Sequence, residues 1–365
     1  MRHLKAAVLG AAITLGISTL AIGQEAMESA CPATTRPAAP TSDTGEAARP
    51  PGIVMAQTVT PSDTSTSVVI SPDTTDQITC GTLALETTSD VLYSSEGKEL
   101  RMDILVPAGE GPKPLIIYVP GGGFVMAMKE QSLELRTFVA EAGFVVASIQ
   151  YRTALDGATY RDGIADVKSA VRYLRAHADE YGIDTDRIGL WGESAGGYMV
   201  AMAGVTNGDT SFDMGDNLDQ SSAVQAVVNK FGATDVSTLG ADFDEAAKAA
   251  YAEPATMIAR YINGPGTTES TVTDPTAHTT ANALTYVDGD EPPFLIFHGS
   301  DDRIISPSQT LMLHDALIAA GDDSTRYVLE GANHGDMGFL GDPLAGLPWS
   351  TNEVMDLITG FFAEM

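Results

Sequence analysis

Cysteine and basic residues are scarce in this chain of 365 residues. The two cysteines, Cys31 and Cys80, are too far apart in the sequence to clamp a zinc ion. Lysine and arginine number 20 against 49 aspartate and glutamate residues, so the formal net charge is −29. Proteins that bind nucleic acid or anionic membranes neutralise phosphates with basic side chains. We therefore expect no nucleic-acid partner and a neutral or cationic ligand.

The chain also lacks an apolar run long enough for a typical membrane-spanning helix. The best candidate, residues 6–22, has 17 residues interrupted by glycine, serine and threonine, whereas a span needs about 20. Arg2, His3 and Lys5 precede it, and a basic start before a short apolar run is typical of a secretory signal. We predict a signal peptide over residues 1–23, a secreted, extracytoplasmic protein and no stable membrane insertion after processing.

Residues 24–80 are rich in alanine, threonine, proline, serine and aspartate and show no sustained hydrophobic period. Such a segment buries too little apolar surface to offset the entropy lost on ordering. We predict a disordered linker over residues 24–80 and one folded domain over residues 81–365. In an exported protein, Cys31 and Cys80 can form a disulfide, which would add up to about 4 kcal/mol to the free energy of unfolding.

The most informative pattern is Gly192-Glu193-Ser194-Ala195-Gly196, which matches G-x-S-x-G. That motif places a serine on a tight turn between a strand and a helix. Residues 187–191 have the pattern of a short buried strand, and residues 196–205 are small and apolar enough for a packed helix. Ser194 is therefore a candidate nucleophile. For the pentapeptide alone, an ordinary glycine-rich turn is the alternative.

A glycine-rich loop follows an upstream strand. Residues 115–119 form a β-branched apolar run that ends in Pro120-Gly121-Gly122-Gly123-Phe124. Such a loop can present bare N–H groups to a developing oxyanion, and losing one such donor costs about 3 kcal/mol of transition-state stabilisation. We predict an oxyanion hole formed by the backbone N–H groups of Gly122, Gly123 and Ala195.

Candidate acid and base residues follow two downstream strands. The run 293–297 is followed by Asp301 and Asp302, and the run 327–329 leads into a small-residue loop that contains His334. A serine hydroxyl needs a neutral imidazole to take its proton, and the imidazole needs a carboxylate to fix its tautomer. The order nucleophile, acid, base predicts His334 as the base and one of the two aspartates as the acid.

Strand-like and helix-like runs alternate along the domain, which predicts an α/β fold with a mostly parallel central sheet flanked by helices. Residues 83–106 have the pattern of an antiparallel hairpin. Residues 236–291 break the alternation and predict a cap insertion that shapes substrate access. Within it, residues 243–261 favour helix and residues 264–277 favour turns.

The segment 83–365 resembles the α/β-hydrolase superfamily, specifically its secreted bacterial carboxylesterases, including the feruloyl and acetylxylan esterase-like and the hormone-sensitive-lipase-like branches. The motifs above carry the resemblance. Further runs that resemble the family are Ser148-Ile149-Gln150-Tyr151-Arg152, residues 166–175, residues 184–188 and Phe231-Gly232-Ala233-Thr234-Asp235.

This resemblance implies an α/β-hydrolase catalytic domain over residues 81–365 and hydrolysis through an acyl-enzyme without a cofactor. It favours Asp302 as the acid, because Asp302 stands four residues after His298 of the His-Gly pair. One departure is Pro120, where many relatives have a histidine that orders the glycine-rich loop.

Phe124 and Tyr198 are predicted to bind substrate, because each lies beside a catalytic motif. Core packing is the alternative for both. Further candidates for the pocket lining are Met126, Phe231, Met337 and Phe339.

The other histidines have simpler interpretations. His177 and His314 lie in amphipathic segments and are predicted to face solvent. His278 falls in the insertion and is predicted to be at the surface, and His298 is predicted to make a structural hydrogen bond. No pair has a metal-ligand spacing such as H-E-x-x-H, so we predict no metal.

The sequence therefore predicts a secreted serine carboxylic-ester hydrolase for short-chain acyl, acetyl or feruloyl-type esters, either small molecules or linked to polysaccharide. A serine peptidase of the same fold is the first alternative, although such relatives usually carry a large N-terminal β-domain. A binding protein on this fold is the second, and it would be expected to have lost a triad residue. The sequence decides neither the ester nor the oligomeric state.

Overall fold

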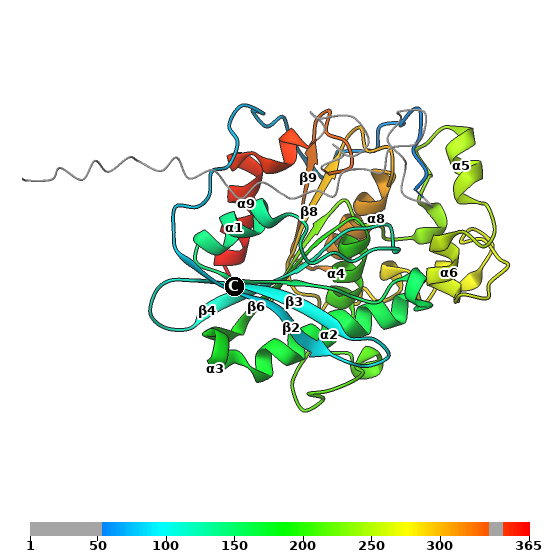
Figure 1. The fold of residues 1–365 in the computed structure, drawn as a ribbon. Helices are drawn as coiled ribbons and strands as arrows, with labels where there is room; N and C mark the ends of the chain where they lie inside the picture. Colours follow the sequence, from blue (N-terminus) through cyan, green and yellow to red (C-terminus); the bar gives the residue numbers. More distant parts are fainter. Residues whose placement is uncertain (1–52, 336–345) are drawn as a thin grey trace, which may run out of the picture.

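One mixed sheet organises the molecule (Figure 1). The computed structural model describes residues 53–335 and 346–365, and in them nine strands pair in the order β1-β9-β8-β7-β6-β4-β5-β3-β2. The strands are β1 (Val68–Ile70), β2 (Leu85–Ser94), β3 (Leu100–Pro107), β4 (Lys113–Val119), β5 (Val145–Ile149), β6 (Ile183–Glu193), β7 (Ala226–Lys230), β8 (Phe294–Gly299) and β9 (Ser324–Leu329). Pairing is parallel except where β3 meets β2 and β5. The predicted mostly parallel sheet and its antiparallel hairpin are confirmed.

Helices cover both faces of the sheet. The α-helices are α1 (Leu133–Glu141), α2 (Tyr160–Ala176), α3 (Ala178–Tyr181), α4 (Ala195–Val205), α5 (Glu245–Tyr251), α6 (Met257–Asn263), α7 (Pro275–His278), α8 (Ser308–Ala320) and α9 (Asn352–Ala363). Short 3₁₀ turns are η1 (Ala154–Asp156), η2 (Thr210–Phe212), η3 (Val236–Thr238), η4 (Ala283–Thr285) and η6 (Leu347–Ser350). Figure 1 shows α1 and α9 together, and both pack into one core, whereas α2, α4 and α8 pack into the other.

Strand β4 explains why two cores form. Its residues Leu115, Ile117 and Val119 belong to the core under α2 and α4. Ile116 and Tyr118 belong to the core under α1 and α9. Successive side chains of a strand point to opposite faces, and a central parallel strand buries both, so its sequence is an unbroken apolar run. Because β4, β6, β8 and β9 run in the same direction, the loops that follow them emerge at the same end of the sheet.

The predicted disordered linker is wrong for residues 53–80, here called the N-terminal segment. Its strand β1 pairs in parallel with β9, and Ile78 is buried. Backbone hydrogen bonds explain why a polar sequence orders: Ala56 N donates to the Arg303 carbonyl at 2.9 Å. Gln57 N also donates to the Asp244 carboxylate, at 2.6 Å. The order of this segment comes from long-range contacts that composition does not reveal.

One histidine prediction changes with this segment. His314 on α8 is buried, not solvent-facing, because its Nε2 lies 2.9 Å from the Thr66 carbonyl and its Nδ1 lies 2.8 Å from Ser324 Oγ. His177 is half-buried at the end of α2, and His278 is exposed as predicted.

The insertion (residues 236–291) lies between β7 and β8 and contains η3, α5, α6, α7 and η4. The helix predicted over 243–261 is two helices, because residues 252–256 between them include Pro254, which cannot continue a helix. Tyr261 of α6 stacks on Phe124 with ring centroids 5.0 Å apart. The insertion therefore reaches the glycine-rich loop.

No helix in the described ranges is long and apolar enough to cross a bilayer. The predicted signal peptide, the first part of the predicted linker and Cys31 lie outside those ranges, so the leader and the pairing of Cys31 with Cys80 stay predictions. Met337 and Phe339 also lie outside the described residues.

Candidate active site

Ser194 occupies the turn between β6 and α4, called here the elbow (residues 192–196). Its φ of 56° is unusual for a residue other than glycine, and such strain is often found at functional sites. A Cβ on Gly196 would lie 2.0 Å from the Val119 carbonyl oxygen, so only glycine lets the elbow approach β4 this closely. Ser194 N donates to the Lys230 carbonyl at 3.0 Å, which fixes the turn against β7.

A buried ion pair between β6 and β7 supports the elbow. Glu193 Oε1 lies 2.7 Å from Lys230 Nζ, and Lys230 is 1% exposed. The Tyr118 hydroxyl donates to Glu193 Oε2 at 2.9 Å. A buried charge is tolerated when it is paired and hydrogen-bonded, and this one ties the residue before Ser194 to β4 and β7.

The structure brings Ser194, His334 and Asp302 together. Ser194 Oγ lies 2.8 Å from His334 Nε2, and His334 Nδ1 lies 2.7 Å from Asp302 Oδ2. An ionised carboxylate only accepts hydrogen bonds, so Nδ1 carries the proton and Nε2 is left to accept one from the serine hydroxyl. The sequence had left Asp301 open as the acid, but the carboxylate that contacts His334 belongs to Asp302.

Asp302 is fully buried and nevertheless favours its charged form. Burial alone raises the pKa of this carboxyl. The charge of His334 and the hydrogen bonds from His298 and His334 outweigh burial, so the pKa lies well below its usual range. The other oxygen, Oδ1, accepts the backbone N–H groups of Ile304 and Ile305, both at 2.9 Å. The carboxylate is thus held at both oxygens.

His334 is also held in place from its own loop. Asn333 Oδ1 accepts the N–H of His334 at 2.7 Å and that of Arg303 at 3.2 Å, which joins the loops after β8 and β9. The ring of Phe231 packs 4.7 Å from the imidazole, and Trp349 packs against Phe231. The sequence prediction included Phe231 only as a pocket residue. It missed Asn333 and Trp349. The position of Asn333 beside His334 in the sequence was a signal for that residue, and Trp349 had none.

The glycine-rich loop (residues 120–124) lies against the elbow. A Cβ on Gly121 would be 3.1 Å from Ser194 Cβ. Among residues 53–335 and 346–365, no hydrogen bond from the backbone N–H of Gly122, Gly123 or Ala195 is found, as expected of the three predicted oxyanion donors. Gly122 has φ 151°, and a Cβ there would lie 2.2 Å from the Met126 carbonyl oxygen. The loop therefore closes into a tight turn that only glycine permits.

A tyrosine from another strand end holds the first residue of the glycine-rich loop. The Tyr151 hydroxyl donates to the Pro120 carbonyl at 2.9 Å, and Tyr151 is 1% exposed. The strand end after β5 thus orders the loop at Pro120. The sequence analysis named Tyr151 only within the run Ser148-Ile149-Gln150-Tyr151-Arg152 that resembles the family.

The predicted substrate-binding role of Phe124 and Tyr198 is wrong for this structure. Both are buried, with Phe124 3% and Tyr198 0% exposed, and their rings pack edge to face at 5.5 Å. The Tyr198 hydroxyl donates to the Ala281 carbonyl at 2.8 Å, so its polar end is already satisfied inside the protein. These two side chains belong to the core that supports the loop and the elbow.

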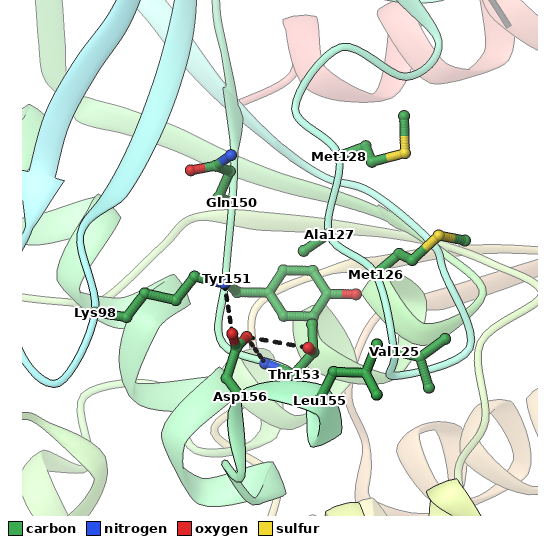
Figure 2. A pocket seen from close by; sticks show the side chains of 10 residues that line it. All are labelled: Lys98, Val125, Met126, Ala127, Met128, Gln150, Tyr151, Thr153, Leu155 and Asp156. Carbon is green, nitrogen blue, oxygen red and sulfur yellow. Dashed lines mark hydrogen bonds and ion pairs between the residues drawn. The ribbon is translucent and has the colours of Figure 1, made fainter. Parts of the chain in front are cut away.

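A hollow of about 320 Å³ lies beside the glycine-rich loop. Figure 2 shows the ring of Tyr151 between the chain that carries Met126 and the turn that carries Asp156. Met126 is 37% and Leu155 67% exposed, and Lys98 forms an ion pair with Asp156 at 2.7 Å. The lining of the hollow thus includes both apolar and charged side chains. Its lining residues are Lys98, Val125, Met126, Ala127, Met128, Gln150, Tyr151, Thr153, Leu155 and Asp156.

In the part of the chain that the structure describes, no three histidine, cysteine or acidic side chains are grouped so that they would hold a metal ion.

The fold, with a serine elbow after β6 and an acid and a histidine after β8 and β9, is that of an α/β-hydrolase. Residues 102–317 match the model of the BD-FAE family, and the chain belongs to that family.

Similar proteins are esterases by name. The chain is 30% identical to Esterase LipQ of Mycobacterium tuberculosis over 255 residues, which is 68% of this chain and 56% of that protein. It is 26% identical to isoprenylcysteine alpha-carbonyl methylesterase ICME of Arabidopsis thaliana over 258 residues, 70% of this chain and 58% of that protein. The chain thus spans about half the length of the curated relatives it matches.

Among solved structures, the chain is similar to a truncated form of a carbohydrate esterase from gut microbiota. The TM-score is 0.64 at 26% identity, and the match covers 81% of this chain and 99% of that chain. Together these findings support a carboxylic ester hydrolase.

Proposed function

We propose that this protein hydrolyses carboxylic esters through an acyl-enzyme, with Ser194 as nucleophile, His334 as general base and acid, and Asp302 as the orienting carboxylate. The observation that carries the proposal is the continuous hydrogen-bonded set, 2.8 Å from Ser194 Oγ to His334 Nε2 and 2.7 Å from His334 Nδ1 to Asp302 Oδ2. Such a set lets a serine hydroxyl lose its proton as it attacks a carbonyl carbon.

These groups account for the bonds and protons that change in the reaction. Ser194 Oγ forms a bond to the carbonyl carbon while its proton passes to His334 Nε2, and the carbonyl oxygen becomes an oxyanion. The N–H groups of Gly122, Gly123 and Ala195 stabilise that charge. The oxyanion then collapses, the bond from the carbonyl carbon to the alcohol oxygen breaks, and His334 protonates the leaving alcohol. Water, deprotonated by the same imidazole, attacks the acyl carbon, the bond to Ser194 Oγ breaks, and the imidazolium returns its proton to Ser194 Oγ as the acid leaves.

The first test measures hydrolysis of p-nitrophenyl esters from acetate to palmitate, comparing the wild type with Ser194→Ala. We expect turnover that favours short acyl chains and falls by at least about 10⁴-fold in Ser194→Ala. Ser211→Ala, at an exposed serine, is the matched control and should keep full activity. Folded protein without turnover on any ester would refute the proposal and favour a peptidase or a binding protein.

The acyl or alcohol portion of an extended substrate is proposed to lie in the hollow beside the glycine-rich loop. Met126, at its rim, is one turn from Gly122, since Met126 N donates to the Gly122 carbonyl at 3.1 Å. Exposed Leu155 offers an apolar contact, and Lys98 and Asp156 offer hydrogen bonds. Such a mixture suits an esterified saccharide, which has both hydroxyls and C–H faces, and the similarity to a carbohydrate esterase supports this choice.

Leu155→Ala tests this placement. We expect the KM for an acetylated xylo-oligosaccharide to rise roughly three- to tenfold, because apolar contact area is lost, while kinetics on p-nitrophenyl acetate stay unchanged. Leu218→Ala is the control, since Leu218 is 61% exposed and does not line the hollow. Equal effects on both substrates would contradict the placement.

Export from the cytoplasm is the remaining part of the proposal, and the basic start followed by the apolar run 6–22 supports it. Activity recovered from the medium or periplasm with residues 1–23 present, and from the cytoplasm without them, is the expected result.

A further inference from the structure

A second imidazole contacts the acid of the proposed triad. His298, on β8, is 0% exposed, and its Nε2 lies 3.0 Å from Asp302 Oδ2. This is the same oxygen that His334 Nδ1 approaches at 2.7 Å. The triad does not need a second histidine, so the contact requires its own explanation.

The surroundings of His298 determine its tautomer. Nε2 faces two groups that only accept hydrogen bonds, Asp302 Oδ2 and the Ile305 carbonyl, each at 3.0 Å. Nε2 therefore carries a proton. Burial lowers the pKa of His298, so the ring is neutral, and Nδ1 is left as an acceptor.

Thr310 and Arg326 complete the arrangement from α8 and β9. Thr310 Oγ1 lies 2.8 Å from His298 Nδ1 and accepts a hydrogen bond from Arg326 Nε at 3.0 Å. The Thr310 hydroxyl faces two acceptors, His298 Nδ1 at 2.8 Å and the Pro307 carbonyl at 3.5 Å, and the shorter contact to His298 receives its proton. Arg326 is fixed in turn by donating to the Pro307 carbonyl at 2.9 Å.

We propose that His298 is a positioning residue whose Nε2–H, hydrogen-bonded to the Ile305 carbonyl at 3.0 Å, is shared with Asp302 Oδ2 at the same distance and so holds the carboxylate in the orientation that His334 requires. This inference rests on the proposed function, because it assigns a partner to the proposed acid. Arg326, Thr310 and His298 form a buried chain of donors that ends at the carboxylate and opposes rotation of its oxygens.

The charged and titratable groups that face His298 are few in the described residues. They are Asp302 and, beyond it, His334 on the loop side, and Arg326 from β9. Tyr251, of the insertion, donates its hydroxyl proton to the Ile304 carbonyl, and burial, with the charge of Asp302 as a smaller cause, raises the pKa of this tyrosine. None of these groups replaces the second donor to Oδ2.

The experiment compares His298→Phe, which keeps a ring but no donor, with His298→Gln, which keeps an N–H. Turnover of p-nitrophenyl acetate gives kcat and KM from pH 5 to 9. We expect kcat to fall roughly 10- to 100-fold in His298→Phe with KM changed less than twofold, as for a lost hydrogen bond to a charged group. His298→Gln should recover most of the loss.

The pH profile separates positioning from packing. In His298→Phe, His334 is the only side-chain donor left to Asp302, so the carboxylate stabilises the imidazolium more strongly. The acid limb of kcat/KM, which reports the free enzyme, should therefore move to higher pH. A limb that stays in place or moves down, or equal losses in the Phe and Gln variants, would overturn the proposal.

Two variants of Thr310 test the same proposal if His298→Phe does not fold. Thr310→Val removes the hydroxyl that fixes the tautomer, and Thr310→Ser keeps it. We expect Thr310→Val to shift the limb and Thr310→Ser to match the wild type, and no difference between the two would count against the proposal. The failure of the proposed function is separate, because it appears as an inactive wild type.

Discussion

On one side of Ser194 the proposed reactive groups are side chains, and on the other they are backbone N–H groups. The acid–base side consists of buried Asp302 and His334, each held by several hydrogen bonds. The oxyanion side consists of the backbone N–H groups of Gly122, Gly123 and Ala195, and a Cβ on Gly122 would lie 2.2 Å from the Met126 carbonyl oxygen. The first side should fail when a functional group is removed, and the second when atoms are added.

The largest effect is expected from Asp302→Asn. The amide keeps the shape of the carboxylate but loses its charge, so His334 is no longer held in the tautomer that accepts the serine proton. We expect kcat to fall about 10⁴-fold with the fold intact. Asp301→Asn is the matched control and should change kcat less than twofold, because the Asp302 carboxylate is the one that contacts His334. Similar losses in both variants would break the assignment of the acid.

Gly122→Ala tests the other side by adding a single carbon. Its Cβ would lie 2.2 Å from the Met126 carbonyl oxygen, so the loop must shift and its N–H groups lose their positions. We expect a loss of about 10²- to 10³-fold in kcat, as for a lost oxyanion donor. Gly266→Ala, where a Cβ would meet nothing within 4 Å, should be silent. Full activity in Gly122→Ala would show that this loop does not form the oxyanion hole.

Low pH should lower the free energy of unfolding through buried His298. Burial lowers the pKa of His298 below the value of about 6.5 for an exposed histidine, so the unfolded chain binds a proton that the folded protein does not. The free energy of unfolding then decreases as pH falls below about 6.5, by at most about 1.4 kcal/mol per pH unit from this group. Urea unfolding at pH 7.5 and 5.5 should show a smaller decrease in His298→Phe than in the wild type. Equal decreases would exclude a neutral buried His298.

The smallest effect is expected from Tyr151→Phe, which removes the hydroxyl bonded to the Pro120 carbonyl. We expect stability to fall by about 1 kcal/mol and kcat by roughly two- to fivefold, because the loop loses one support but keeps its N–H groups. Tyr286→Phe removes a similar hydroxyl–carbonyl bond, at 2.8 Å to Thr280, inside the insertion. It should change stability alone, and a matching loss of kcat there would mean that Tyr151 has no particular role.

The predicted site residues that the structure brings together are those that follow a recognisable local pattern. Ser194, His334 and Asp302 each follow a strand whose apolar run is legible, and parallel strands bring their ends together. Phe124 and Tyr198 were misassigned because proximity in sequence to a motif does not reveal which way a side chain points. Both point into the core.

Other contacts were beyond prediction because they join residues distant in sequence. His298 meets Thr310 and Arg326 from two other elements, and periodicity carries no information about such pairs. The N-terminal segment is the extreme case. Its composition favours disorder, yet it contributes β1 to the sheet and buries Ile78.

That segment has a practical consequence for anyone who expresses or modifies this protein. A gene trimmed to begin at residue 81, as composition suggests, would remove the strand that covers the edge of β9 and leave that edge open to other chains. Ala56 is hydrogen-bonded to Arg303, the neighbour of Asp302. An affinity tag or a fused domain joined a few residues before Ala56 would therefore be attached close to the loop that carries the proposed acid, and a purification handle is better placed elsewhere.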